Sequence, residues 1–187
     1  ESPVMPRLCA RCQHLSTQLL EAFDVPGIQM DQYLDHDEVA EVTRELEHLD
    51  AQGLTEYVRH GYKFGRLALY DVSIELKRYD HMGLSGEDLL LWRNQTLTAV
   101  MVYSAMRKLI RKHGIGRVVT YNQYANCASA QLAAQDEAIP FFTSYHSSHL
   151  SGDLRRLVVI PNGSDRDIAA RNFANWPQWR PLTISVA

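Results

Sequence analysis

A strand, a helix and a second strand follow one another closely in the second half of this 187-residue chain, and this pattern constrains its fold most. The β-branched run 117–121 predicts a buried strand, the alanine-rich run 127–137 a helix, and 139–144 the next strand. Strands joined through a helix are expected to lie parallel, with a right-handed crossover. Residues 155–160 predict a third strand. The sequence therefore predicts an α/β fold with a parallel sheet and flanking helices.

The first half of the chain is predicted to be rich in helices. Apolar residues recur at three- and four-residue spacing over 7–23 and again over 35–50, which is typical of amphipathic helices. The clearest helix runs from Gly86 to His113, and Gly114 supplies its end. Residues 65–78 alternate between apolar and polar as a strand does, while their flanks favour a helix. Both interpretations of 65–78 stay open.

The predicted sheet is small for a parallel one. Two or three parallel strands cannot bury a doubly wound sheet, because each strand needs neighbours and helices are needed on both faces. We therefore expect an incomplete sheet. Its further strands would precede residue 1, come from 65–78, or come from a partner chain.

Length and composition bound the organisation and the partners. The chain fits a single domain over 1–187, with a helical part (1–83), a core of helix and strand-helix-strand (84–174) and a tail or linker (175–187). A net charge of −3 gives no basic field for nucleic acid, so we expect no nucleic-acid partner. Three cysteines, no leader and no transmembrane run favour a cytoplasmic protein.

Polar loops follow the first two predicted strands, where an open parallel sheet binds its ligands. The first loop offers Asn122, Tyr124 and Asn126, and the second offers His146 and His149. Amide, imidazole and aromatic groups together suit a sugar, which has hydroxyls at its edges and an apolar face for stacking. The alternatives are turn and helix-cap roles for the asparagines and a solvated loop for the histidines. No carboxylate or cysteine accompanies the histidines, so no metal site is predicted.

Two further features have competing interpretations. The helix 86–113 is longer than the strand that follows it, so its first turns should pass the carboxyl end of that strand. Arg93 would then bind a phosphate or carboxylate, or it is an ordinary surface arginine. Cys9 and Cys12 form a Cys-x-x-Cys pair at a helix start, which is a redox or zinc motif in other settings and is structural or incidental otherwise.

The run Arg117-Val-Val-Thr-Tyr-Asn-Gln-Tyr-Ala-Asn, an alanine-rich helix and Ala138-Ile-Pro-Phe-Phe-Thr together resemble bacterial glycosyltransferases of capsule and surface-polysaccharide biosynthesis. The segment His60-Gly-Tyr-Lys-Phe-Gly-Arg-Leu-Ala-Leu looks like the one that precedes the long helix in that group. The resemblance covers most of 9–161. Ala138 departs from it, because glycine is common at that position.

The resemblance implies a Rossmann-like, N-terminal, acceptor-side half of a two-domain GT-B enzyme. Asn122 and Tyr124 would face the cleft between the halves, and His146 would be the general base. A glycan acceptor would bind this half, while a nucleotide-sugar donor, with no other cofactor, would bind mainly a C-terminal half that this chain lacks. The isolated chain would then bind acceptor without turnover. The alternatives are a noncatalytic binding or assembly domain, and a small metal or redox module built on Cys9 and Cys12.

Overall fold

The computed structural model describes residues 14–24, 26–78, 80–122, 124–146 and 157–163. Its contacts divide the chain into two compact units, Glu1–Gln32 and Tyr33–Ala187. In the first unit, residues 14–22 are helical, within the interval predicted from the apolar spacing. Leu15, Leu19 and Phe23, one turn apart along this segment, are exposed. A short 3₁₀ helix, η1 (Met30–Tyr33), crosses the boundary between the units.

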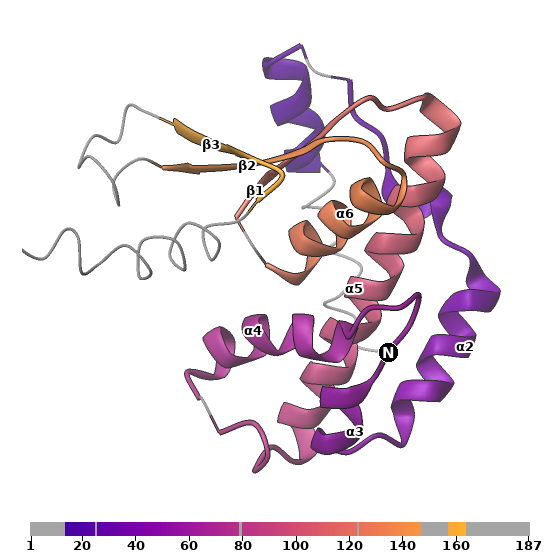
Figure 1. Cartoon of the computed structure of the whole chain (residues 1–187), viewed down its shortest axis with the longest axis vertical. Helices are drawn as coiled ribbons and strands as arrows, with labels where there is room; N and C mark the ends of the chain where they lie inside the picture. The colour runs from indigo at the N-terminus through magenta and orange to yellow at the C-terminus, as the bar shows by residue number, and fades with distance from the viewer. Residues whose placement is uncertain (1–13, 25, 79, 123, 147–156, 164–187) are drawn as a thin grey trace, which may run out of the picture. The chain divides into compact units, whose positions relative to one another are not determined.

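Helices make up most of the described part of the second unit (Figure 1). Its elements follow in the order α2 (His36–Glu47), α3 (Ala51–Glu56), α4 (Phe64–Leu76), α5 (Gly86–His113), β1 (Val118–Tyr121), α6 (Ala125–Asp136), β2 (Phe141–His146) and β3 (Leu157–Pro161). The predicted bounds of α5 are confirmed at both ends, and Gly114 adopts the left-handed conformation that ends the helix. The predictions of α2, β1, α6 and β2 are confirmed within a few residues.

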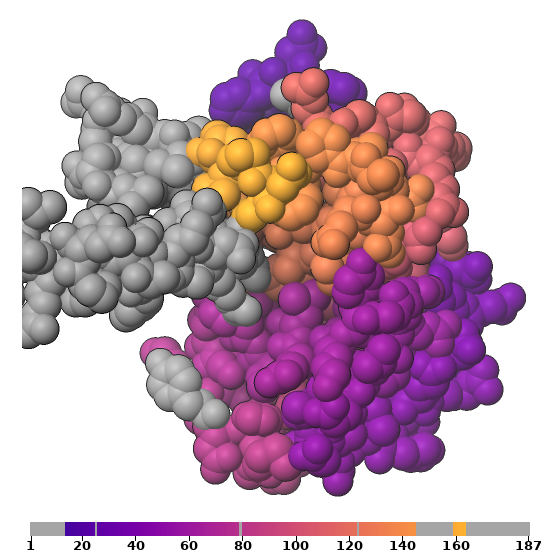
Figure 2. Space-filling view, in the orientation of Figure 1, coloured from indigo at the N-terminus to yellow at the C-terminus, as the bar shows by residue number. Residues whose placement is uncertain are grey.

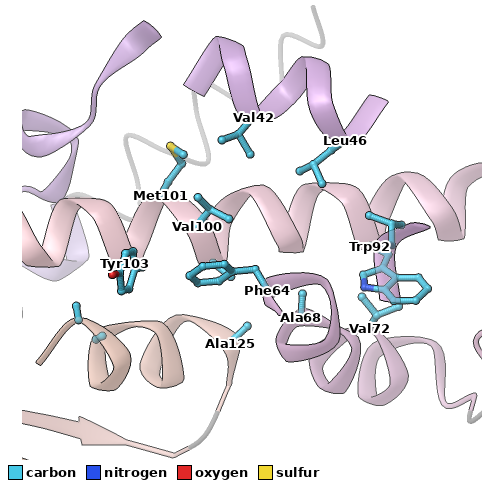
Figure 3. Close-up of a cluster of buried hydrophobic side chains, with 14 of the residues drawn as sticks. Val42, Leu46, Phe64, Ala68, Val72, Trp92, Val100, Met101, Tyr103 and Ala125 are labelled. Atoms are coloured by element: carbon cyan, nitrogen blue, oxygen red, sulfur yellow. The ribbon is translucent and has the colours of Figure 1, made fainter. Parts of the chain in front are cut away.

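The long helix α5 is the centre of the hydrophobic core. Figure 3 shows α2 along one side of α5, with α4 and α6 along the other. Trp92 and Tyr103 are the two largest fully buried side chains, and both belong to α5. The larger core side chains from the neighbouring helices are Val42, Leu46, Leu54, Phe64 and Val72. The strands are thus attached to a core that is mainly helical.

Residues 64–76 form the helix α4, so the strand interpretation of 65–78 is wrong. The residues that suggested alternation do not share a face: Val72 is fully buried, whereas Tyr70 and Ile74 are 41% and 45% exposed. Helical spacing places Phe64, Ala68 and Val72 on one buried stripe. This segment therefore contributes no strand to the sheet.

Gly65 permits the close approach of α4 to α3. A Cβ built on Gly65 would lie 1.8 Å from the carbonyl oxygen of Leu54, so only glycine fits here. The carbonyl oxygen of Gly65 accepts a hydrogen bond from Trp92 Nε1 at 2.7 Å. One glycine thereby joins α3, α4 and α5.

The described strands form one mixed sheet in the order β1-β2-β3. β1 and β2 are parallel, with Val118 opposite Phe141, as the intervening helix α6 requires. β2 and β3 are antiparallel, with His146 opposite Leu157, so the prediction of an all-parallel sheet is wrong for β3. The architecture is a helix-rich α/β arrangement with a small mixed sheet.

A buried polar network joins α6 to the inner face of the sheet. The Gln131 side-chain amide donates to Thr120 Oγ1 at 2.6 Å and to Thr143 Oγ1 at 2.8 Å. The Thr143 hydroxyl in turn donates to the carbonyl of Gly163 at 2.9 Å. Because one amide contacts both parallel strands, this network fixes where α6 lies across them.

The other face of the sheet carries exposed apolar side chains. Val119 of β1 and Val159 of β3 are 64% and 54% exposed. Figure 2 shows atoms of β3, in yellow, at the molecular surface. Among the described residues, helix α6 packs against one face of the sheet. The expectation that further strands precede residue 1 or come from a partner chain stays a prediction, since α4 supplies none.

Charged and hydroxyl groups hold the end of α6. Asp136 accepts hydrogen bonds from Tyr62 Oη at 2.5 Å and from Tyr103 Oη. Its neighbour Glu137 accepts from Arg107 Nε and Arg111 Nε, both at 2.7 Å. Burial raises the pKa of Tyr103 to about 12, and its hydrogen bond to Asp136 adds to this rise. The Tyr103 hydroxyl therefore stays protonated near neutral pH and can donate its hydrogen bond to Asp136.

Candidate functional site

The turn between β1 and α6 lies at the carboxyl end of the parallel strands. Asn122 has a φ of 78°, a left-handed conformation that asparagine adopts more readily than most residues. Its side-chain oxygen accepts a hydrogen bond from the backbone N–H of Tyr124 at 3.1 Å. Asn122 therefore has the turn role that the sequence left open as an alternative to ligand binding.

A carboxylate from another helix caps the start of α6. Tyr124 occupies the N-cap position and makes no side-chain capping hydrogen bond. Asp71 of α4 instead accepts the backbone N–H of Ala125, at 2.9 Å to one carboxylate oxygen and 3.2 Å to the other. A negative charge at this end of a helix is favoured by the helix dipole. The contact fixes α4 against the first turn of α6.

Two exposed tyrosines lie beside this cap. Tyr70 precedes Asp71 on α4, and Tyr124 precedes Ala125 at α6, so the Asp71 contact brings their rings together. The ring centroids are 6.4 Å apart and the planes are inclined by 42°. The two residues are 41% and 44% exposed. We call Tyr70, Asp71, Asn122 and Tyr124 the β1-edge site.

Aromatic faces that remain exposed beside polar acceptors can bind sugars. A pyranose ring stacks its C–H face on an aromatic ring, and its hydroxyls bond to nearby carboxylate or amide groups. Tyr121, at the end of β1, is a further exposed aromatic residue, 52% exposed. The β1-edge site therefore places an exposed aromatic pair next to a carboxylate and an amide.

The other predicted site residues have different positions. Asn126 lies within the first turn of α6 and is exposed, rather than in a loop. His146 is the last residue of β2, so the chain there is still a strand and not the predicted loop. Since Tyr121 is the register partner of Ser144, the backbone of His146 continues past the end of β1 at the same edge of the sheet. His149 lies outside the described residues.

Arg93 is engaged away from the β1-edge site. Its Nε and Nη2 both donate to the carbonyl oxygen of Leu49, at 3.1 and 2.6 Å. Leu49 lies between α2 and α3. Arg93 therefore ties α5 to this connection, and the neighbouring Trp92 is a core residue.

Cys127 is the cysteine whose surroundings the structure describes. Its Sγ donates to the carbonyl oxygen of Tyr121 at 3.3 Å. Burial is the main cause that raises the pKa of its thiol, and the charge of Asp71 raises it further. Such a thiol is a poor nucleophile near neutral pH. Cys9 and Cys12, the candidate metal or redox pair, lie outside the described residues.

The described residues contain neither a metal-binding cluster nor a membrane-spanning helix. Within the ranges that the structure describes, histidine, cysteine and acidic side chains do not gather in groups of three or more that could hold a metal ion. None of the helices in those ranges combines the length and the apolar character needed to cross a membrane.

Sequence reasoning missed Tyr70 and Asp71, the half of the β1-edge site that α4 supplies. Their segment had two open interpretations, and a strand there would have separated their side chains to opposite faces. Asp71 binds a backbone group 54 positions along the chain, and no local motif signals such a contact.

Comparisons of the chain with protein-family models, with curated proteins and with solved structures found no match.

Proposed function

We propose that this chain is the acceptor-side, N-terminal half of a glycosyltransferase that transfers a sugar from a nucleotide-sugar donor during surface-polysaccharide or glycoconjugate biosynthesis. The observation that carries the proposal is the Tyr70–Tyr124 pair, exposed at the carboxyl end of a parallel β1-α6-β2 unit. Ligands of open α/β sheets bind at this edge. The resemblance described from the sequence supplies the reaction class.

In this proposal, the acceptor sugar stacks at the β1-edge site and its nucleophilic hydroxyl points towards the donor. Sugar transfer needs a base that removes the hydroxyl proton as the new bond to the anomeric carbon forms. His146 is the residue that the resemblance assigns to this role. A second, C-terminal half would bind the nucleotide-sugar and stabilise the departing phosphate.

Ligand-observed NMR with oligosaccharides tests the proposal on the isolated chain. Tyr124→Ala should weaken glycan binding about fivefold, because stacking on one aromatic ring contributes about 1 kcal/mol. Phe23→Ala is the control, since it removes an exposed aromatic ring of the first unit. Equal binding by wild type, Tyr124→Ala and Phe23→Ala would contradict the proposed site.

A noncatalytic assembly domain is the second candidate, and the exposed outer face of the sheet favours it. Val119 and Val159 present apolar area that a partner would cover. Val119→Lys should then abolish association in a sedimentation experiment while leaving glycan binding intact. If the chain stays monomeric at all concentrations and binds no added partner, this candidate loses its support.

A further inference from the structure

The side of β1 that faces away from β2 plays no part in the proposed function. In the described part of the sheet, β1 pairs with β2 on one side and has no strand on the other. The backbone N–H of Val118 donates to the carbonyl of Pro140 at 3.1 Å, and the carbonyl of Thr120 accepts from the Ser144 hydroxyl at 3.1 Å. Both residues thus turn their backbone groups towards β2. Because this direction alternates along a strand, the N–H and C=O of Val119 point to the opposite, open side.

The sequence of β1 favours pairing with another strand on this open side. Natural sheets protect their edges with charged residues, prolines or bulges. β1 has the sequence Val-Val-Thr-Tyr, which contains no charge and no proline and consists of residues with high β propensity. The side chain of Val119 is 64% exposed, so it presents apolar area beside its outward backbone groups. This side of β1 therefore suits an added strand.

A second copy of β1 fits this position in the antiparallel direction. A two-fold axis through Val119 makes the two valines a hydrogen-bonded pair, in which each N–H donates to the carbonyl of the other copy. The same register places Arg117, which is exposed and directly precedes β1, opposite Tyr121 of the second copy. A parallel arrangement would instead bring the two Arg117 side chains to the same level, where like charges repel. The strand is thus complementary to itself in one direction.

We infer that the open side of β1 is an interface that binds β1 of a second copy and extends the sheet across a two-fold axis. The partner strand that the small sheet was expected to require is then this chain's own β1. The inference goes beyond the proposed function and does not depend on it. It also differs from the assembly candidate, in which a partner covers the outer face of the sheet, because here the backbone of Val119 makes the contact.

Amide hydrogen exchange of the whole chain, measured over a range of protein concentrations, tests the pairing directly. In the monomer the N–H of Val119 should exchange quickly. Its exchange should become about tenfold slower once about nine-tenths of the chain is dimeric, because only the monomer exposes it. The N–H of Val118 is the internal control, since it bonds within the chain and should stay protected at every concentration. Sedimentation equilibrium gives the dimer fraction in the same samples.

Three variants separate this contact from other interfaces. Val119→Pro removes the outward N–H, and proline is tolerated in an edge strand at such a position. Val119→Lys keeps the N–H but sets two like charges opposite each other on the axis. Both should be monomeric, with circular dichroism checking the fold, and Val119→Lys decides if Val119→Pro does not fold. Val159→Lys is the matched control, because it changes a valine of the outer face on β3 that is 54% exposed, and it should dimerise like wild type.

Dimers of wild type and Val159→Lys, together with monomeric Val119→Pro and Val119→Lys, would support the inference. It is overturned if wild type stays monomeric at all concentrations, if the N–H of Val119 is protected in the monomer, or if a folded Val119 variant dimerises as wild type does. Loss of the dimer in Val159→Lys would also overturn it and assign the contact to the outer face. Absence of glycan binding would contradict the proposed function and leave this inference standing.

Discussion

Replacing Gly65 with alanine should destabilise the chain strongly. The new Cβ would lie 1.8 Å from the carbonyl oxygen of Leu54 and 2.8 Å from its carbonyl carbon, both closer than the 3.0 Å that real Cβ atoms respect. Because both are backbone atoms, no side-chain rotation relieves the clash. The start of α4 must therefore move away from α3.

The size of the effect is the sum of three contributions. Overpacking of this kind costs about 1–3 kcal/mol. The shift also disturbs the 2.7 Å hydrogen bond from Trp92 to Gly65, and a buried donor left without its acceptor costs about 1–3 kcal/mol. The better helix propensity of alanine offsets about 1 kcal/mol. We expect a net loss of about 3 kcal/mol, or about 6–12 °C in Tm for a chain of this size.

Urea unfolding followed by circular dichroism measures this loss. Gly53→Ala is the matched control: a Cβ there meets side-chain atoms of Leu49 and Asp50 at 3.0 Å or more, and these can move. It should be nearly neutral. A Gly65→Ala variant whose stability lies within about 1 kcal/mol of the Gly53→Ala variant would refute the close approach of α3 and α4.

Two other perturbations probe the ties that hold α6. Gln131→Leu removes the amide shared by Thr120 and Thr143 and should lower the free energy of unfolding in urea by about 1–3 kcal/mol. Gln135→Leu, at an exposed position, is the control and should have little effect. Equal decreases in the two variants would argue against the buried network. Burial raises the pKa of Asp136, but hydrogen bonds from Tyr103 and Tyr62 outweigh it and hold that pKa below its usual value. A carboxyl with a lowered folded-state pKa stabilises the fold above its unfolded-state pKa, and this is lost as the pH falls through the folded value. Asp136→Asn should therefore lower the urea midpoint at neutral pH, and the difference from wild type should shrink as the pH falls through the folded-state pKa. A difference that does not shrink with falling pH would contradict this linkage.

Local sequence patterns were sufficient to predict the helices and strands that have a strong apolar periodicity or a clear end signal. The bounds of α5 follow from its apolar spacing and from Gly114, and the β1-α6-β2 unit follows from a β-branched run, an alanine-rich helix and a second short strand pattern over 139–144. The helix α4 was undecided because Tyr70 and Ile74 supply apolar alternation although both are exposed. Only the tertiary contacts of its other face, led by Phe64, select the helix.

Strand direction and long-range contacts could not be predicted in the same way. The composition of β3 resembles that of a parallel strand, and no local pattern signals its antiparallel pairing with β2. Arg93 has a surface-like sequence context, yet its donors bind the backbone of Leu49, 44 positions away. Asp71 likewise takes its role from a partner that is distant in sequence.

The two carboxylates at opposite ends of α6 have a consequence for ligand binding. Asp71 holds the first turn to α4, and Asp136 holds the last turn to Tyr62 and Tyr103. These contacts hold Tyr70 and Tyr124 next to each other before any ligand binds. If a sugar ring stacks there as proposed, few side chains need to be ordered on binding, so little conformational entropy would be lost.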